Sequence, residues 1–145
     1  MEIALAHEKA RFQEKSGILS IRPDADIRCT LPGMYNRLLE HISVHRWYLG
    51  EARKSEVPFS EAVASWYDNV YTPLVDVILE QDILKDFPGR TETDLYLWII
   101  RHQWHLRETY GEDIPLHKAV QTFTKDHSER PMNLVVKVLN KITGG

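Results

Sequence analysis

The sequence repeats itself at an offset of 57 residues, which places His45 on His102 and Trp47 on Trp104. The aligned pairs are Ile42 and Ile99, His45 and His102, Trp47 and Trp104, Leu49 and Leu106, Glu51 and Glu108, Pro58 and Pro115, Ala62 and Ala119, Val63 and Val120, and Trp66 and Phe123. Chance rarely places histidine, tryptophan, glutamate and proline at the same spacing twice, so we interpret the chain as two copies of one unit. Two copies of this length favour a pseudo-symmetric bundle, because a solenoid has more and shorter repeats.

A stripe of apolar residues predicts the first helix of each copy. The stripe residues are Leu38, Ile42 and Leu49 in the first copy and Leu95, Ile99 and Leu106 in the second. A Pro-Gly pair precedes both stripes. In the second copy, Thr91 and Asp94 also have the spacing of a capping box, which marks the start of a helix.

Prolines mark the other two helices of each copy. The second helix is predicted to begin near Pro58 or Pro115, because proline suits a first turn. Its expected core residues are Ala62, Val63 and Trp66 in the first copy and Ala119, Val120 and Phe123 in the second. Pro73 and Pro131 should break or kink the path, since a proline inside a helix costs about 3 kcal/mol. The predicted third helices span about 74–81 and 132–140.

About thirty residues precede the first copy. Residues 2–16 are predicted to form a helix that ends at Gly17, since glycine suits the position after a helix. Residues 18–31 carry short apolar runs around the turn-forming segment 23–26, so an extended arm and a small hairpin are both open.

Together these elements predict an all-α fold, a pseudo-symmetric helical bundle built from two tandem three-helix repeats, with an N-terminal helix and an extended arm. We expect a single domain over 1–145, because the sequence contains no low-complexity linker. Its parts are 1–30 for the N-terminal helix and arm, 31–86 for the first repeat and 87–145 for the second.

The composition excludes several classes of protein. Hydrophobic content of 43% with 27% charged residues is ordinary for a globular protein. A formal net charge of -3 gives no support to a broad nucleic-acid-binding surface, although a local basic patch stays possible. Cys29 is the single cysteine, which excludes an intramolecular disulfide and a cysteine-rich zinc site. The charged N-terminus and short apolar runs predict a cytoplasmic protein that does not contact a membrane.

His45 and His102 lie within the apolar stripes of the two first helices. A buried imidazole left without a hydrogen bond costs about 1–3 kcal/mol, so both rings should have a partner. The simpler interpretation is a pair of core histidines that bond a carbonyl or a polar group of the other copy. The alternative is a shared site at the pseudo-twofold axis that binds a metal, a haem or an anion.

Each copy also carries a tryptophan and a glutamate four residues apart, on a face turned away from the histidine. These candidate binding residues are Trp47 and Glu51 in the first copy and Trp104 and Glu108 in the second. We favour packing between helices for the tryptophans. A ligand or partner groove with an aromatic floor and an acidic rim is the functional alternative.

Two further patterns suggest binding. The loop 87–94 enters a helix N-terminus, where Arg90 could help to hold an anion, although Glu92 and Asp94 make helix capping the better account. His41 and His45 have a spacing found in helical metal sites, but the second copy has Trp98 in place of His41. His102 and His105 form a different pair without a third ligand, so we predict no metal site.

Three segments, 39–49, 61–68 and 87–98, carry a resemblance to a known family. They resemble a bacterial helical domain of unknown function that occurs alone or beside other modules, in proteins loosely labelled as transcriptional regulators or ParB-like proteins. The similarity runs from about Ile21 to Ile114. The resemblance implies no activity, cofactor or catalytic residue, and the regulatory label is only an association.

The sequence contains no nucleophile elbow, phosphate-binding loop, dinucleotide fingerprint or zinc-protease motif. We therefore predict a non-enzymatic binding or regulatory module without a cofactor. Its partner would be an unknown protein, or a second copy bound through an exposed aromatic face. One alternative is a sensor or enzyme whose ligand or metal lies between the repeats near His45 and His102. The other is a nucleic-acid-binding regulator, whose affinity would fall steeply with salt.

Overall fold

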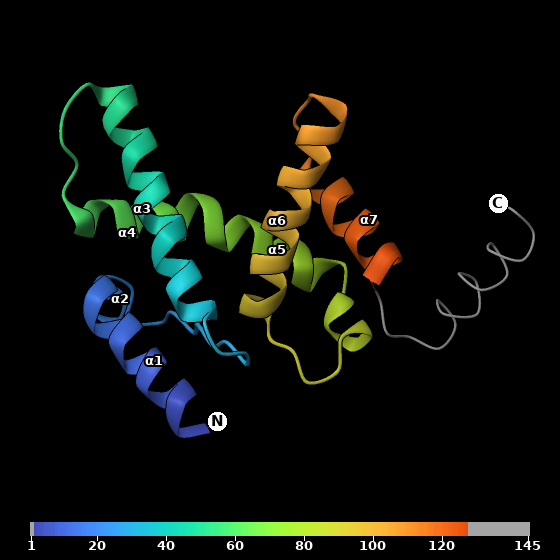
Figure 1. The fold of residues 1–145 in the computed structure, drawn as a ribbon, viewed down its shortest axis with the longest axis horizontal. Coiled ribbons are helices and arrows are strands. Elements are labelled where there is room, and N and C mark those ends of the chain that lie inside the picture. The colour runs from blue at the N-terminus through green and yellow to red at the C-terminus, as the bar shows by residue number, and fades with distance from the viewer. Residues whose placement is uncertain (1, 128–145) are drawn as a thin grey trace, which may run out of the picture.

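The computed structural model describes residues 2–127, and this part of the chain is a bundle of helices without a β-strand (Figure 1). The predicted all-α class is confirmed. The third helix predicted at 132–140 lies outside the described residues, as does Pro131. Within the described part, no helix has the length and apolar character needed to cross a membrane.

The chain begins with helix α1 (Glu2–Ser16), which ends where the sequence predicted. Gly17 adopts the left-handed conformation with φ 64°, which glycine reaches without a steric penalty. The Ser16 hydroxyl donates to the Phe12 carbonyl at 2.7 Å and accepts from the Ile18 amide at 3.2 Å. A short helix, α2 (Ile18–Ile21), follows at once, so the start of the predicted arm is helical.

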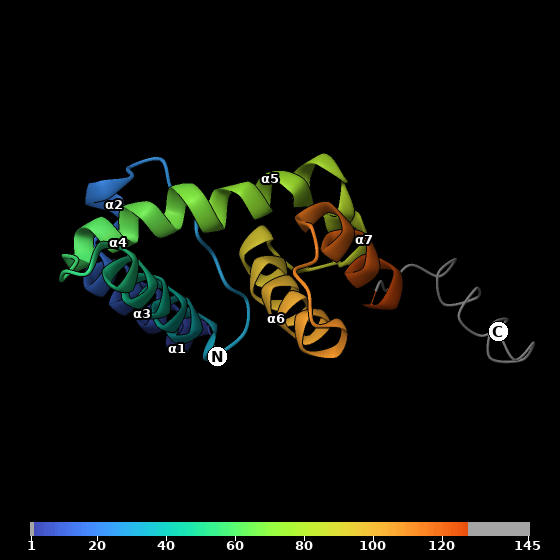
Figure 2. The ribbon, with the colours of Figure 1, turned by 90° about the horizontal axis from the view of Figure 1, so that it is seen from above.

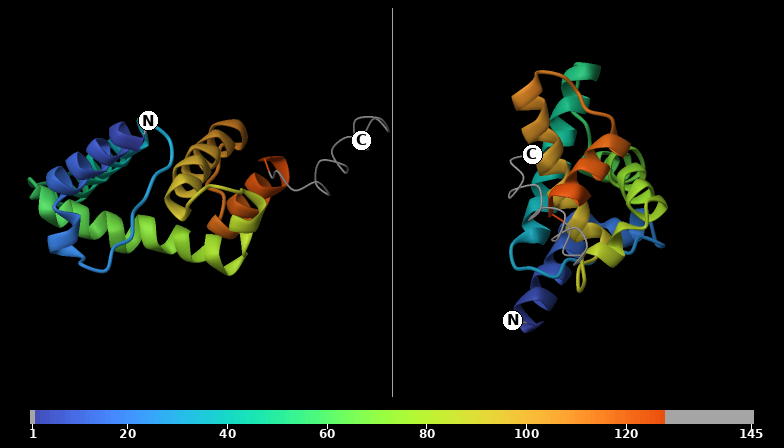
Figure 3. Two further views of the ribbon diagram at one scale, coloured as in Figure 1. Left: turned by 90° about the horizontal axis from the view of Figure 1, so that it is seen from below. Right: turned by 90° about the vertical axis from the view of Figure 1, so that its right-hand side faces the viewer.

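After α2 an extended arm crosses the molecule to the start of the second half, as Figure 3 shows. The hairpin alternative is wrong, because residues 18–31 form no strand. The arm is held by hydrogen bonds to side chains far along the sequence. The Thr30 amide and hydroxyl donate to the two oxygens of Asp94 at 2.9 and 2.6 Å, and the Arg28 amide donates to the Thr93 hydroxyl at 3.2 Å.

Helices α3 (Met34–Arg53) and α4 (Phe59–Trp66) form the first helix pair. Helix α3 begins after the Pro32-Gly33 pair and α4 begins directly after Pro58, as the sequence predicted. The expected core residues of α4 are fully buried. The pair is closed by the Arg46 side chain, whose Nε donates to the Val57 carbonyl at 2.7 Å in the loop between the helices.

Helix α4 does not stop at the predicted break. It continues through the π-helical segment η1 (Tyr67–Tyr71) into α5 (Thr72–Glu80), and Figure 2 shows the three as one long rod. In an α-helix the ring of Pro73 would collide with the carbonyl four residues before it. The wider π-turn, in which the Thr72 amide bonds the Tyr67 carbonyl, removes that collision. The expected break at Pro73 is therefore a local widening.

The second half consists of a 3-10 turn, η2 (Ile83–Asp86), and the helix pair α6 (Glu92–Tyr110) and α7 (Leu116–His127). The predicted capping box at the start of α6 is confirmed, because the Thr91 hydroxyl accepts from the Asp94 amide and the Asp94 carboxylate accepts from the Thr91 amide. α7 begins directly after Pro115, and its expected core residues are buried.

The rod formed by α4, η1 and α5 is the spine of the molecule. Helices α1 and α3 pack near its first end and α6 and α7 near its second, with α3 and α6 standing side by side (Figures 1 and 3). One hydrophobic cluster extends through both ends. At its centre the indole Nε1 of Trp66 donates to the Tyr96 hydroxyl at 3.0 Å, and the rings of both residues pack against Tyr71.

The two helix pairs share a local contact at the repeat spacing. In the second pair the Gln103 side chain donates to the Ile114 carbonyl at 2.8 Å, and Arg46 and Val57 make the same contact in the first pair. The second copy's third helix falls outside the described residues. The pseudo-symmetry of two three-helix units therefore stays a prediction.

Candidate ligand-binding site

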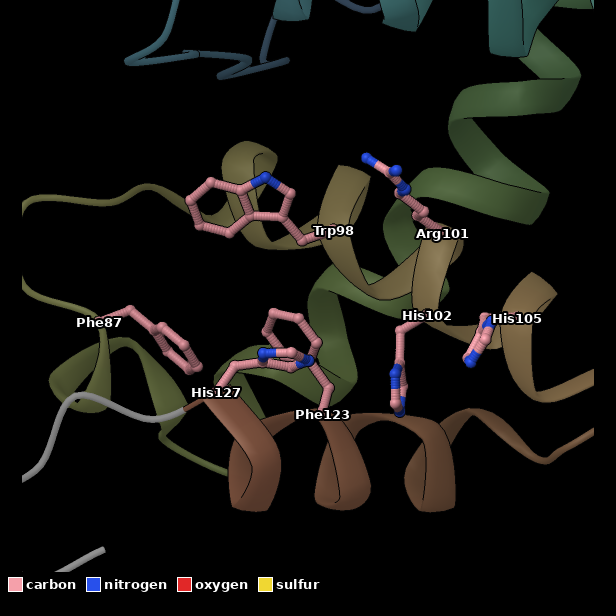
Figure 4. Close-up of a pocket in the computed structure, with 7 residues that line it drawn as sticks. All are labelled: Phe87, Trp98, Arg101, His102, His105, Phe123 and His127. Carbon is pink, nitrogen blue, oxygen red and sulfur yellow. The ribbon is translucent and has the colours of Figure 1, made fainter. Parts of the chain in front are cut away.

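A cavity of about 450 Å³ lies between α6 and α7 (Figure 4). Its lining residues are Phe87, Trp98, Arg101, His102, His105, Phe123 and His127. The cavity falls within the size range of small-molecule sites, which is about 300–1,000 Å³. The described residues that line it include three apolar aromatic rings, three imidazoles and one guanidinium, and no carboxylate.

Helical spacing brings these side chains together. On α6, Trp98 lies three residues before Arg101 and four before His102, and His105 lies four and three residues after them, so the four side chains share a face. On α7 the cavity residues are likewise four apart. Phe87 closes one end from the loop after η2.

Aromatic rings form one wall of the cavity. Phe123 is its centre, with ring centroids 5.4 Å from Phe87, 4.8 Å from His127 and 5.7 Å from His102. Figure 4 shows these rings in a row along α7, with Trp98 facing them from α6. Offset and tilted rings at such distances attract one another and leave flat faces for a planar ligand.

One ring nitrogen of His102 is hydrogen-bonded within the fold, and the other can accept a proton. Its Nε2 lies 2.9 Å from the Thr122 hydroxyl, which itself donates to the Ala119 carbonyl at 3.2 Å. The hydroxyl proton is therefore engaged, and we place the imidazole hydrogen on Nε2 and the free lone pair of the neutral ring on Nδ1. Burial lowers the pKa of His102, and the nearby His127 and His105 lower it further, whereas Asp126 raises it.

His45 makes the matching contact in the first helix pair, since its Nε2 lies 2.8 Å from the Ser65 hydroxyl. Burial lowers the pKa of His45 as well. Both His45 and His102 are half-buried, so they lie less deep than the apolar stripes predicted. Each bonds a hydroxyl on the second helix of its own pair, where we expected a carbonyl or a group of the other copy. His45 does not line the cavity that His102 lines, so this cavity is not shared by the two histidines.

The tryptophans at the repeat positions are more exposed than the expected packing between helices would leave them. Trp47 is 60% exposed and Trp104 is 53% exposed. Trp47 and Glu51 line an open hollow of about 850 Å³ on α3, with Tyr48 edge-on to the indole at 5.0 Å. An aromatic and an acidic residue thus line one hollow, and the binding of a ligand or partner there stays a prediction.

Trp104 lies in a different setting from Trp47. Its ring stacks on His41 of α3 with centroids 5.9 Å apart, and it lines a hollow of about 330 Å³ between α3 and α6. Glu108 is exposed and does not line the hollow that Trp104 lines. The two tryptophan-glutamate pairs are therefore not equivalent surfaces.

Arg90 is engaged with its neighbours in the fold. Its Nη1 donates to the Thr30 hydroxyl at 2.9 Å, and its guanidinium lies over the Trp98 ring at 5.7 Å. The arginine thus connects the arm to the tryptophan that forms a wall of the cavity. This agrees with helix capping as the account of the loop, since Asp94 completes the capping box there.

A buried chain of three polar groups was not predicted. The Tyr96 hydroxyl accepts from the Trp66 indole, so its own proton is free to reach His41 Nδ1 at 3.0 Å. Burial lowers the pKa of His41, because the charged ring would be poorly solvated and would lose this donor. One sequence feature sets His41 apart. In the alignment of the two copies, His41 of the first copy falls on Trp98 of the second, so this histidine is not part of the repeat.

Two other candidate chemistries find little support in the geometry. Cys29 is buried, and burial raises the pKa of its thiol far above the usual range, so the reactive thiolate is disfavoured. Among residues 2–127, no three histidine, cysteine, aspartate or glutamate side chains lie close enough together to hold a metal ion.

Sequence reasoning identified His102, and it paired His102 with His105 by spacing. It missed Phe87 and His127, which come from other parts of the chain. The interval of four between Phe123 and His127 was a usable signal, since it places both on one face of α7. No protein-family model, curated protein or solved structure matches this chain.

Proposed function

We propose that this protein is a binding module whose ligand is a small planar aromatic molecule held between α6 and α7. The observation that carries the proposal is the cavity of about 450 Å³ lined by Phe87, Trp98 and Phe123 together with three imidazoles. Flat rings on opposite walls favour a flat guest, because stacking adds to the gain from removing apolar surface from water.

The proposal is tested by calorimetric titration of the full chain with naphthamide, an uncharged bicyclic probe. At about 0.3–0.5 kcal/mol per non-hydrogen atom, we expect a Kd of roughly 0.02–1 mM and one site per chain. His127→Ala should weaken binding several-fold, because it removes one ring of the wall. His117→Ala, on the same helix and outside the cavity, is the matched control.

A second pair of variants separates this site from the exposed aromatic surface. Trp98→Ala should abolish measurable naphthamide binding, whereas Trp47→Ala should leave it unchanged. Circular dichroism reports whether each variant is folded. The proposal fails if the parent chain does not bind, or if Trp47→Ala loses as much affinity as Trp98→Ala.

Self-association is a second candidate function, favoured by the exposed surface of α3. Trp47 and Tyr48 are 60% and 62% exposed. The hollow beside them carries both signs of charge, contributed by Arg46, Glu51, Lys54 and Glu56. A twofold contact places the same surface of two copies face to face, so a surface with both signs of charge allows basic groups of one copy to pair with acidic groups of the other.

Sedimentation velocity over a range of concentrations tests this second candidate. We expect a concentration-dependent dimer that Trp47→Ser disrupts. Trp104→Ser is the matched control, because it changes the aligned tryptophan on α6. A chain that stays monomeric at every concentration, or a dimer disrupted only by Trp104→Ser, would remove the candidate.

We also propose that the helix pairs α3–α4 and α6–α7 arose from one duplicated unit. The hydrogen bonds of His45 and His102 to hydroxyls, and of Arg46 and Gln103 to loop carbonyls, support this because all four follow the same offset. Membership of the bacterial helical family, a regulatory role, a cytoplasmic location and nucleic-acid binding stay predictions.

A further inference from the structure

The charged and titratable residues that line the cavity between α6 and α7 are all basic. Its permanently charged lining residue is Arg101 on α6, whose guanidinium Figure 4 shows on the side away from His102, and which also lines the neighbouring hollow between α3 and α6. The lining also contains the imidazoles of His102, His105 and His127, and an imidazole carries a positive charge when it is protonated. Among the described lining residues no aspartate or glutamate balances these groups.

We propose that the ligand of this cavity is an aromatic anion, an arene that bears a carboxylate, and that its binding is coupled to the uptake of a proton by the histidines. This inference rests on the proposed function, since it specifies the charge of the same aromatic guest. The arene lies against the Trp98 and Phe123 rings, and the carboxylate lies toward the imidazoles.

The arrangement of His102 favours proton uptake on ligand binding. Its Nε2 hydrogen is committed to Thr122, so an added proton goes to Nδ1 and creates a new donor. Without a bound anion, that charge is opposed by burial and by His127 and His105, and it is favoured by Asp126. A bound carboxylate offsets the repulsion, because an opposite charge within a few ångströms favours the protonated ring.

The groups around the imidazoles all bear on this coupling. Helix α6 contributes Arg101 beside its two histidines, and α7 contributes His127 with Asp126 next to it in sequence. Helix α3 contributes Glu40, which lines the neighbouring hollow together with Arg101 and does not line the cavity. Asp126 favours the charged form of His102, but it does not line the cavity. The loop after η2 contributes the uncharged Phe87 to the lining, and Arg90 is held over the Trp98 ring by the arm. The balance of these charges favours an anion.

The test compares naphthoate with naphthamide, two probes of one shape that differ in charge. Calorimetric titrations of the full chain are run at about pH 8, 7 and 5.5, where naphthoate stays ionised and histidine changes its charge. We expect naphthoate affinity to rise about five- to tenfold across this range, while naphthamide affinity stays constant. Repeating the titration in buffers of different ionisation enthalpy counts the protons taken up.

Variants at exposed positions identify the groups responsible. His105→Gln and His127→Gln should each reduce the pH dependence for naphthoate, and Arg101→Gln should weaken naphthoate at every pH. His7→Gln, an exposed histidine on α1, is the matched control and should change neither.

The outcomes separate the two proposals. If naphthamide and naphthoate bind equally at each pH, the aromatic site stands and the anion inference is overturned. If neither probe binds the folded parent chain, the proposed function itself fails. An unchanged pH dependence in both His105→Gln and His127→Gln also overturns the inference.

Discussion

The indole Nε1 of Trp66 donates to the Tyr96 hydroxyl at 3.0 Å, and this bond joins the spine of the molecule to α6. Both side chains are almost completely buried. The same hydroxyl lies 3.0 Å from His41 Nδ1 on α3. One phenol oxygen therefore connects three helices that belong to both halves of the chain.

Tyr96→Phe should destabilise the fold by about 1–3 kcal/mol, because it leaves a buried indole donor and a half-buried imidazole nitrogen without this partner. Urea unfolding followed by circular dichroism measures the loss. Tyr48→Phe removes an exposed hydroxyl and is expected to have no effect. If Tyr96→Phe and the parent chain have the same free energy of unfolding, the hydroxyl makes no net contribution to stability.

The stability of the fold should fall as the solution becomes acidic. Burial lowers the pKa of His41, so the unfolded chain takes up this proton at a higher pH than the folded chain does. The contribution of neutral His41 is complete above the unfolded pKa of about 6.5 and is lost as the pH falls toward the folded pKa. Protonation also removes the acceptor that the Tyr96 hydroxyl uses.

Urea unfolding at about pH 7.5 and pH 5.5 tests this dependence. His41→Gln should make the free energy of unfolding less sensitive to pH than in the parent chain, because glutamine does not titrate. His7→Gln should keep the parent's dependence, since His7 is exposed. Parallel curves for the parent and His41→Gln would contradict the prediction.

Asp94→Ala should release the arm from α6 and cost about 2–4 kcal/mol. The carboxylate is fully buried and accepts hydrogen bonds from the Thr30 amide, the Thr30 hydroxyl and the Thr91 amide. Its removal loses both the helix cap and the long-range contact.

Hydrogen exchange gives this prediction a local readout. The Thr30 amide should exchange much faster in Asp94→Ala, whereas the control Asp76→Ala, at an exposed position of α5, should leave it protected. If the Thr30 amide stays equally protected in Asp94→Ala, the arm is held by other contacts.

The paired histidines should have equal effects on stability and unequal effects on binding. His45→Ala and His102→Ala each lose one hydrogen bond to a hydroxyl, so each should cost about 0.5–1.5 kcal/mol. Only His102 lines the cavity, so only His102→Ala should weaken naphthoate binding. Thermal melts and calorimetric titrations of both variants provide the comparison, and an equal loss of affinity would contradict it.

Local sequence patterns predicted most of the helices because the forces that form them are local. The Gly17 terminus, the Thr91 cap and the starts of α4 and α7 after proline depend on residues within a turn of one another. The buried faces of α4 and α7 followed from helical spacing in the same way.

The remaining features depend on contacts that no local pattern encodes. Thr30 meets Asp94, and His41 meets Tyr96, across more than fifty residues of sequence. The cavity has the same origin, because it forms only where α7 brings His127 against α6. Helix periodicity predicts which face a residue occupies, but not which other face it meets.

The π-helical segment η1 has a consequence for the spine beyond accommodating Pro73. Trp66 and Leu74 are eight residues apart, a spacing that in a plain α-helix turns them roughly 80° away from each other. Both are fully buried. The wider turn takes up about one residue, so the two side chains have nearly the rotational phase of an i, i+7 pair. One edge of the spine therefore stays apolar along its whole length and serves both helix pairs.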